Sequence, residues 1–475
     1  MSLFKKTKIV ATLGPACDDE KNILKMILEG VDVFRINFSH ASNNEIKDQI
    51  KLIRSLSDKV KTNVSILADL QGPKLRVGII KKGTSLIKDD RVKFITKEPF
   101  EGDSSQVYIN YKRFPKDVKK GEKILLDDGK LIFKVLSTDN KNIVSTIVVQ
   151  GGDFLSKKGV NLPNTKISLP ALTEKDISDA IFAIKEKVDW LALSFVRNEK
   201  DLKSLKKIID EHSDHKIPII AKIEKPEAII NIKKIIKNCD GLMVARGDLG
   251  VEIPAAEVPL IQKQLVHRAK KARIPVIIAT QMMENMINGL TPTRAEVNDV
   301  ANSVMDGADA VMLSGETSIG KYPIEVIKTI TSILYKVENS PLIIVPQKPP
   351  SIRTKRFITK AICYHAALMS NEISAKAICT LTNSGYTAFQ ISAWRPSATI
   401  LVFSSNKRIL SQLNLLWGVK SFYYDRFEST DNTIEEVNNM AISKGYALKG
   451  DMLINLASMP ITNKGMVNTL RVSII

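Results

Sequence analysis

The chain has 475 residues, which predicts two or three domains and excludes a single small binding module. Hydrophobic residues make up 44% and charged residues 25%, so the composition excludes a disordered or collagen-like chain. The 70 Lys and Arg against 51 Asp and Glu leave a net charge of +19. This excess indicates an anionic partner. The charge alone does not distinguish between nucleic acid, an anionic membrane surface and phosphorylated small molecules.

Eight short, apolar, β-branched runs precede residue 320 and alternate with amphipathic segments of helical period, one of them over residues 226–238. The runs begin at Lys8, Val33, Val64, Trp190, Ile219, Gly241, Pro275 and Ala310. Nearly continuous apolar strands are typical of a parallel sheet covered on both faces. Eight strand-helix units predict a closed (β/α)8 TIM barrel over residues 1–70 and 166–340, with a doubly wound open sheet as the alternative.

Residues 71–165 interrupt this alternation. Helical period gives way there to Gly, Lys and alternating apolar positions, over a length that no bare loop reaches. The pattern predicts a small β-barrel domain inserted after the third strand, as a lid over the face where the barrel strands end.

Pro341, Pro346, Pro349 and Pro350 mark residues 341–354 as a linker that cannot continue a helix. Beyond it, helical and β-branched segments alternate again and predict a separate C-terminal α/β domain over residues 355–475.

Four cysteines form no CxxC pair and stand in apolar stretches, which is typical of a reduced, cytoplasmic protein. No apolar run has the length of a signal segment or of a membrane span, so we expect neither secretion nor a membrane association.

Polar side chains close most of the barrel strands. They are Arg35, Asn37, Ser39, His40, Asp69, Lys222, Glu224, Arg246, Asp248, Thr280 and Glu316. Each alone could be a solvated strand end or a cap. Because the carboxyl ends of all eight strands meet at one rim, where such barrels carry out their chemistry, the set predicts a functional site.

Lys222 and Glu224 stand two residues apart on one strand and therefore share a face. Glu224 and Asp248 offer two carboxylates without His or Cys, a ligand set that suits Mg²⁺, although either could instead be a salt-bridge partner. Beside the cations Arg35, Lys222 and Arg246, the pair indicates a phosphate and metal site suited to phosphoryl transfer.

Eight motifs now carry a family resemblance. KIVATLGPA, FRINFSH, ADLQGPKLRVG, AKIEKPEA, MVARGDLG, IIATQMMENM, PTRAEVNDVANSVMDGADAVMLSGET and GKYP, in this order, resemble pyruvate kinases. The match is close from Thr7 to Pro323 and looser in the C-terminal domain. It implies transfer of the phosphoryl group of phosphoenolpyruvate to ADP, giving pyruvate and ATP, by a homotetramer whose C-terminal domain serves effector binding and oligomerisation.

The resemblance also implies catalytic roles. Arg35 would hold the transferring phosphoryl group, and Lys222 would stabilise its charge and the enolate oxygen. Glu224 and Asp248 would bind Mg²⁺, with Mn²⁺ as an alternative. Thr280 would take part in protonation of the enolate carbon through water.

Further residues would surround the substrates. By the same resemblance, the backbone of Ala245, Arg246 and Gly247 would lie near the substrate carboxylate. Asn37, His40 and Arg76 would face the nucleotide.

A K⁺ site in many members of this family matches Asn37, Ser39, Asp69 and the carbonyl of Leu70. Members that need K⁺ carry Glu where this chain has Lys74. A tethered ammonium can supply the charge of K⁺, so Lys74 predicts an enzyme that does not require it. The alternative is that Lys74 is a solvated lysine at the hinge of the lid.

The segment TNSGYT resembles the family's effector loop, with Thr382, Asn383, Ser384, Gly385 and Thr387 as its candidate residues. Hydroxyls and amides before a helix that begins near Ala388 predict a phosphate site, with a plain capping turn at Thr387 as the alternative. The chain end lacks the Trp and Arg that some members use for a second phosphate, which favours a monophosphate effector.

Two other functions compete with this one. The charge of +19 also suits a nucleic-acid-binding protein, but the lysines lie on many separate helices without an aromatic-rich basic stripe, so we expect no nucleic acid. A Mg²⁺-dependent keto-acid lyase or aldolase could use Lys222, Glu224 and Asp248, but it has no need of the nucleotide-facing residues.

Overall fold

A computed structural model describes residues 4–39, 41–163, 165–340, 349–351, 356–426, 429–460 and 465–475. His40 and most of the expected linker, apart from residues 349–351, therefore lie outside the described residues.

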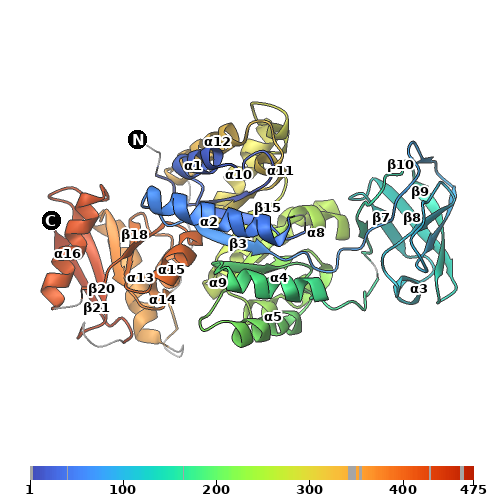
Figure 1. Ribbon diagram of the computed structural model, residues 1–475. Coiled ribbons are helices and arrows are strands. Elements are labelled where there is room, and N and C mark those ends of the chain that lie inside the picture. Colours follow the sequence, from blue (N-terminus) through green and yellow to red (C-terminus); the bar gives the residue numbers. More distant parts are fainter. Residues whose placement is uncertain are drawn as a thin grey trace.

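A closed parallel barrel forms the centre of the molecule, in the order β1-β16-β15-β14-β13-β12-β3-β2 (Figure 1). Its strands are β1 (Lys8–Thr12), β2 (Val33–Asn37), β3 (Ser65–Asp69), β12 (Trp190–Leu193), β13 (Ile219–Ile223), β14 (Gly241–Ala245), β15 (Val276–Ala279) and β16 (Ala310–Leu313). Each lies within one of the eight predicted runs. The TIM barrel is thereby confirmed, and the open-sheet alternative is wrong because β1 pairs with both β2 and β16.

Amphipathic helices cover the barrel. They are α1 (Glu20–Glu29), α2 (Asn43–Lys59), α4 (Glu174–Lys185), α5 (Glu199–His212), α6 (Pro226–Ile230), α7 (Ile232–Ile236), α9 (Val258–Ala272), α10 (Arg294–Asp306) and α12 (Pro323–Glu338). Capping boxes at Ser42, Thr173 and Thr293 fix where α2, α4 and α10 begin, because each cap exchanges hydrogen bonds with an acidic residue three positions later. Two short helices, α8 (Arg246–Glu252) and α11 (Gly315–Ser318), directly follow β14 and β16.

The single helix expected over residues 226–238 is divided. Asn231 separates α6 from α7 with a non-helical backbone, and its Nδ2 donates to the carbonyl of Arg197 at 3.0 Å. This tertiary hydrogen bond explains why the apolar periodicity did not reveal the break.

A second body projects from one end of the barrel (Figure 1). Its six-stranded sheet has the order β11-β7-β8-β9-β5-β6, and a small β10-β4 pair lies beside it. The elements are β4 (Ser85–Leu86), β5 (Arg91–Ile95), β6 (Gln106–Tyr108), α3 (Phe114–Asp117), β7 (Lys123–Leu126), β8 (Leu131–Thr138), β9 (Ile143–Gln150), β10 (Gly152–Asp153) and β11 (Val160–Asn161). This domain has its own hydrophobic core, which is expected of an inserted lid domain and includes Phe94, Phe114, Phe133 and Phe154. The domain bounds 71–165 stay a prediction.

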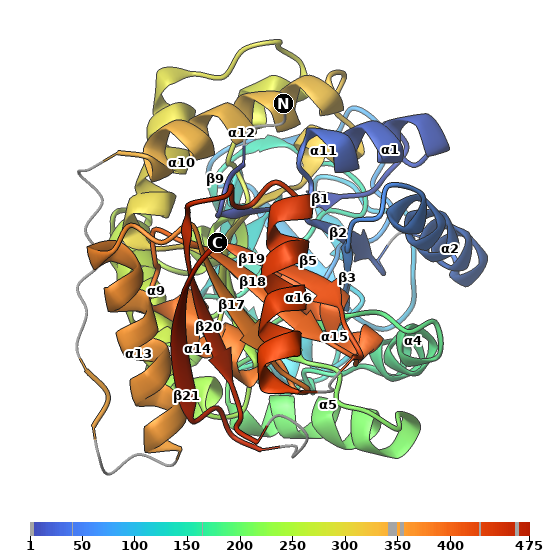
Figure 2. The same ribbon diagram turned by 90° about the vertical axis from the view of Figure 1, so that its left-hand side faces the viewer.

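The C-terminal domain docks on the opposite end of the barrel (Figures 1 and 2). Its sheet runs β19-β18-β17-β20-β21, parallel except for the edge strand β21. Its elements are α13 (Phe357–Glu372), β17 (Ala377–Leu381), α14 (Tyr386–Ala393), β18 (Thr399–Ser404), α15 (Lys407–Gln412), β19 (Val419–Tyr423), α16 (Thr430–Ser443), β20 (Met452–Ala457) and β21 (Thr469–Ile474).

This docking uses the face where the barrel strands begin. Lys8 Nζ donates to the carbonyl of Val419 at 2.8 Å, and Trp190 Nε1 donates to that of Gln412 at 3.1 Å. The strand C-termini thus remain free to face the lid. In the described part of the chain, no helix has the length and hydropathy of a membrane span.

Candidate active site

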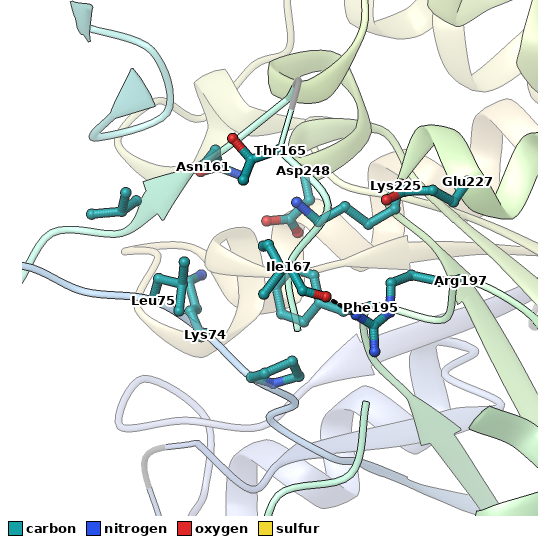
Figure 3. Close-up of a pocket in the computed structure, with 12 residues that line it drawn as sticks. Lys74, Leu75, Asn161, Thr165, Ile167, Phe195, Arg197, Lys225, Glu227 and Asp248 are labelled. Carbon is teal, nitrogen blue, oxygen red and sulfur yellow. Dashed lines mark hydrogen bonds between the residues drawn. The ribbon is translucent and has the colours of Figure 1, made fainter. Parts of the chain in front are cut away.

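A cleft of about 560 Å³, open to solvent, lies between the strand C-termini and the lid (Figure 3). The lid contributes Asn161, the chain entering the lid contributes Lys74, and the barrel contributes Phe195, Lys225 and Asp248. The lid therefore forms one wall of the site, as its expected position predicts.

Beside this cleft, Arg35, Asp69 and Lys222 form one network. Arg35 Nε donates to Asp69 Oδ2 at 2.7 Å, and Lys222 Nζ lies 3.2 Å from Asp69 Oδ1. Strand register explains the first contact, because β2 and β3 run parallel with Asn37 opposite Asp69, which puts Arg35 one pleat away on the same face. Both cations are about nine-tenths buried, with 12% and 11% of their side chains exposed.

Electrostatics keep these groups ionised. Burial would raise the pKa of Asp69, but Lys222 and Arg35 outweigh it and hold that pKa below its usual range. Burial likewise opposes the charge of Lys222, yet the carboxylates of Asp69 and Glu224 raise its pKa above the ordinary value. The site thus presents permanent positive charge where a phosphoryl group would need it.

Glu224 and Asp248 are the candidate metal ligands. Glu224 accepts the backbone N–H of Phe195 at Oε2, 2.7 Å, and its Oε1 lies 2.9 Å from Lys222 Nζ. Burial raises the pKa of Glu224 despite Lys222, and Asp248 raises it further. A buried carboxylate whose charge is disfavoured by burial and by a second carboxylate nearby fits a hard divalent cation, which would relieve that cost. Among the described residues no group of three or more His, Cys, Asp or Glu could hold a metal, so water or substrate oxygens would complete its shell.

Arg246 and Thr280 meet at the next two strand ends. Arg246 pairs with Asp299 at 2.6 Å and donates to the carbonyl of Thr280 at 2.7 Å. Thr280 Oγ1 accepts the N–H of Gly247 at 2.7 Å. Thr280 has φ of +70°, a strained conformation for a β-branched residue, and such strain gathers at functional sites. Ala245 ends β14 and so leads the chain into this turn.

The residues expected near nucleotide and K⁺ are only partly brought together. Asn37 is half-buried and accepts the N–H of Ser39 at 3.1 Å. The carbonyl of Leu70 is engaged by Ser194 Oγ at 2.7 Å. Arg76 lies at the base of the lid, where its NH1 donates to the carbonyl of Lys157 at 2.9 Å.

Lys74 lines the cleft together with Asp248 (Figure 3). Lys74 is partly exposed there, a position that both the cation-replacing role and the hinge alternative predict.

Three residues of this site were not anticipated. Ser194 receives a hydrogen bond from Lys222 Nζ at 2.7 Å, Thr12 Oγ1 accepts from Arg35 at 3.1 Å, and Asp299 pairs with Arg246. Ser194 directly follows β12, so the rule of polar strand ends could have found it. Asp299 lies inside α10, where no strand-end signal exists.

Glu316 has a structural role. It is 2% exposed and accepts the backbone N–H groups of Met283 and Ser314 at 3.1 and 2.7 Å. Glu316 therefore holds two loops of the rim together, and both of its carboxylate oxygens already accept a hydrogen bond.

The candidate effector loop lies far from this site, in the C-terminal domain. Helix α14 begins at Tyr386 with Gly385 as its N-cap, and Thr382 Oγ1 accepts the N–H of Gly385 at 3.1 Å. The expected start near Ala388 with Thr387 as cap is wrong. Thr387 is buried, and its Oγ1 accepts a hydrogen bond from Thr380 Oγ1 on β17 at 3.0 Å. Its hydroxyl is therefore used between strand and helix and does not cap the helix.

Comparison with known proteins decides the family. Residues 4–327 match the model described as "Pyruvate kinase, barrel domain", and residues 360–473 match "Pyruvate kinase, alpha/beta domain". The chain belongs to the pyruvate kinase family. Relatives named pyruvate kinase include one from Corynebacterium glutamicum, 41% identical over 99% of this chain and 98% of its own. Another, from Mycobacterium tuberculosis, is 39% identical over the same shares.

A solved pyruvate kinase from Cryptosporidium parvum matches the fold with a TM-score of 0.90 at 31% identity, over 99% of this chain and 96% of its own. Pyruvate kinases transfer the phosphoryl group of phosphoenolpyruvate to ADP, and the chain is a phosphotransferase of this kind. Family membership over nearly the full length excludes the lyase and nucleic-acid interpretations as the main function.

Proposed function

We propose that Arg35, Lys222 and Thr280 are the catalytic residues of this pyruvate kinase. The buried network in which Lys222 contacts Asp69 and Glu224 is the observation that carries the proposal. Phosphoryl transfer requires positioning and fixed positive charge more than covalent chemistry from the protein. Lys222, held charged beside Arg35, supplies that charge at the rim of the barrel.

The roles divide along the rim. Arg35, oriented by Asp69, holds the transferring phosphoryl group. Lys222 stabilises the negative charge that develops on the phosphoryl and enolate oxygens. Arg246 acts by fixing the turn whose backbone, at Ala245 and Gly247, receives the substrate carboxylate.

Thr280 would hold the proton donor. Its hydroxyl touches Gly247 N, so a water bound beside it would lie next to the enolate carbon of a substrate bound on that turn. Asn37 from the barrel rim and Arg76 from the base of the lid would face the nucleotide, together with His40, which lies outside the described residues.

Glu224 and Asp248 would hold Mg²⁺, or Mn²⁺ in its place. When bound, the cation supplies Lewis-acid stabilisation of the substrate oxygens. A coupled assay for pyruvate tests both parts of the proposal. We expect formation of pyruvate to depend on ADP and on added Mg²⁺ and to stop with EDTA; unchanged turnover in EDTA would contradict the metal assignment.

We further propose that Lys74 makes K⁺ dispensable. The ammonium of Lys74, in a family position where members that need K⁺ carry Glu, supports it, while Asn37, Ser39, Asp69 and Leu70 would form the monovalent-cation site that Lys74 replaces. Turnover should persist with tetramethylammonium as the only monovalent cation. Lys74→Glu should then create a dependence on K⁺, and Lys82→Glu, on an exposed lysine of the lid, should not. Loss of most wild-type activity without K⁺ would overturn the proposal.

The loop of Thr382, Asn383, Ser384, Gly385 and Thr387 is proposed to bind a phosphorylated effector, preferably a monophosphate, in a cytoplasmic homotetramer. Four cysteines that are unpaired and buried support a reducing compartment. Assays with sugar phosphates and AMP should show activation by at least one monophosphate, and light scattering should give four times the chain mass. No response to any compound would make the loop purely structural.

A further inference from the structure

A small cavity of about 230 Å³ lies at the seam between the barrel and the C-terminal domain. The end of α9 contributes Lys270 and Arg273, the start of β16 contributes Asp309, and the end of α14 contributes Ser392 and Arg395. This seam is at the end of the barrel away from the active-site cleft (Figure 1). This volume includes space open to solvent, and the enclosed part has room for about one water-sized guest.

Arg395 is the most deeply buried cation of this cavity, with 4% of its side chain exposed. Its NH2 lies 3.0 Å from Asp309 Oδ1 and donates to the carbonyl of Gly307 at 2.6 Å. Its Nε and NH1 have no hydrogen-bond partner anywhere in the described residues. A buried guanidinium with two unused donors is costly unless something accepts from them.

Arg273 repeats this pattern from the other side of the seam. Its NH1 is likewise buried without an acceptor among the residues the structure describes, while its guanidinium lies 4.1 Å from the ring centre of Trp394. The stacked ring holds the guanidinium in place but cannot accept the NH1 hydrogen bond in its plane.

The charges of the cavity do not balance. Its lining holds three cations, Lys270, Arg273 and Arg395, and a single carboxylate, Asp309. Two further carboxylates act on these cations from outside the lining. Glu338, which accepts the N–H groups of Lys6 and Thr7, acts on Arg395, and Asp306, which pairs with Lys263, acts on Lys270. Burial, followed by the charge of Arg395, lowers the pKa of Lys270 to about 8, although Asp309 and Asp306 oppose the shift.

Arginine cannot relieve this excess by losing a proton. A water molecule would accept from the free donors but would bring no charge. We propose that the cavity binds a small inorganic anion, of halide size, which accepts from Arg395 Nε and NH1 and balances the excess charge at the seam.

Anomalous scattering tests the proposal directly. Crystals of the full chain grown with bromide as the only halide should show an anomalous peak within hydrogen-bond distance of Arg395. A site that holds only water would give electron density without an anomalous signal, and that result would overturn the proposal.

Thermal unfolding provides a second test in solution. At constant ionic strength, replacing gluconate by chloride should raise the Tm by about 1 to 3 °C, because the anion binds only the folded chain. Arg273→Gln should reduce this shift by at least half, whereas the exposed Lys271→Gln on the same helix should keep it. An equal shift in both variants would show that the halide acts on the surface and not in this cavity.

Discussion

Lys222 is the residue on which the charge of the active site depends. Its ammonium contacts Asp69, Glu224 and Ser194, all of them buried, so its position is fixed before any substrate binds. Such preorganised charge costs no rearrangement when negative charge develops during the reaction.

We therefore predict that Lys222→Gln lowers kcat by on the order of a hundredfold or more while the fold is retained. A coupled pyruvate assay measures the rate, and circular dichroism checks the fold. The matched control is Lys206→Gln, on an exposed lysine of α5, which should leave kcat unchanged. A Lys222→Gln enzyme within a few-fold of wild type would remove Lys222 from the catalytic set.

At the scale of residues, the sequence predicted side chains that end strands and missed those that act from elsewhere. Arg35, Lys222 and Glu224 were found because barrel strands bring their ends to one rim. Asp299 was missed because it reaches Arg246 from a helix 53 positions away, a contact that only the packing of α10 creates. The positive φ of Thr280 could not be predicted either, because no residue type indicates a strained backbone.

At the scale of elements, a short polar chain attaches the lid to the barrel. Asn161, on lid strand β11, donates from Nδ2 to Glu252 Oε1 at 2.9 Å, and the same oxygen accepts from Lys225 Nζ at 2.5 Å. Lys225 directly follows the metal-candidate Glu224, and Glu252 ends α8, which begins at Arg246. The contact thus joins the lid to both sides of the active site.

Asn161→Ala should loosen this contact and raise the KM for ADP roughly fivefold, the equivalent of about 1 kcal/mol for one hydrogen bond. Steady-state kinetics measure KM and kcat separately. Hydrogen exchange should show faster exchange along β11. Asn142→Ala, in the exposed turn between β8 and β9 of the lid, serves as the control and should change neither quantity. If KM and exchange stay at wild-type values, the contact does not hold the lid.

The elements themselves were largely predictable, because their apolar periodicity is a local property. All eight barrel strands fall within their predicted runs. The exceptions, at Asn231 and at the start of α14, arise where a side chain forms a hydrogen bond with a residue of another element. Tertiary hydrogen bonds of this kind leave no periodic signal.

At the scale of the whole molecule, buried charge also lies between the barrel and the C-terminal domain. Asp32 pairs there with Lys5, Lys8 and Lys420. Lys8 is 1% exposed, and burial lowers its pKa to about 7 even though Asp32 opposes the shift. The net charge of +19 gave no hint of this cluster, because a count of charges does not say which of them are buried.

This depressed pKa makes the free energy of unfolding depend on pH. Unfolded, Lys8 would titrate near about 10.4, so between pH 7 and that value the unfolded chain binds more protons than the folded one. Stability therefore rises with pH, by at most about 1.4 kcal/mol per unit from this group. Above about pH 8.5 the cysteines oppose this rise in stability. Burial raises the pKa of all four thiols to about 12, namely those of Cys17, Cys239, Cys363 and Cys379. The unfolded chain therefore loses these protons at a lower pH than the folded chain does.

Between pH 7 and 8.5 the cysteines contribute little, and Lys270, whose pKa burial lowers to about 8, contributes equally to wild type and to a Lys8 variant, so the difference between the two reports Lys8. Over this range, the free energy of unfolding from urea titrations should rise in the wild type and rise less steeply in Lys8→Met, which cannot take up the proton. Lys21→Met, on an exposed lysine of α1, should keep the wild-type slope. Parallel slopes in Lys8→Met and wild type would mean that Lys8 stays protonated throughout, with Asp32 outweighing the burial of its ammonium.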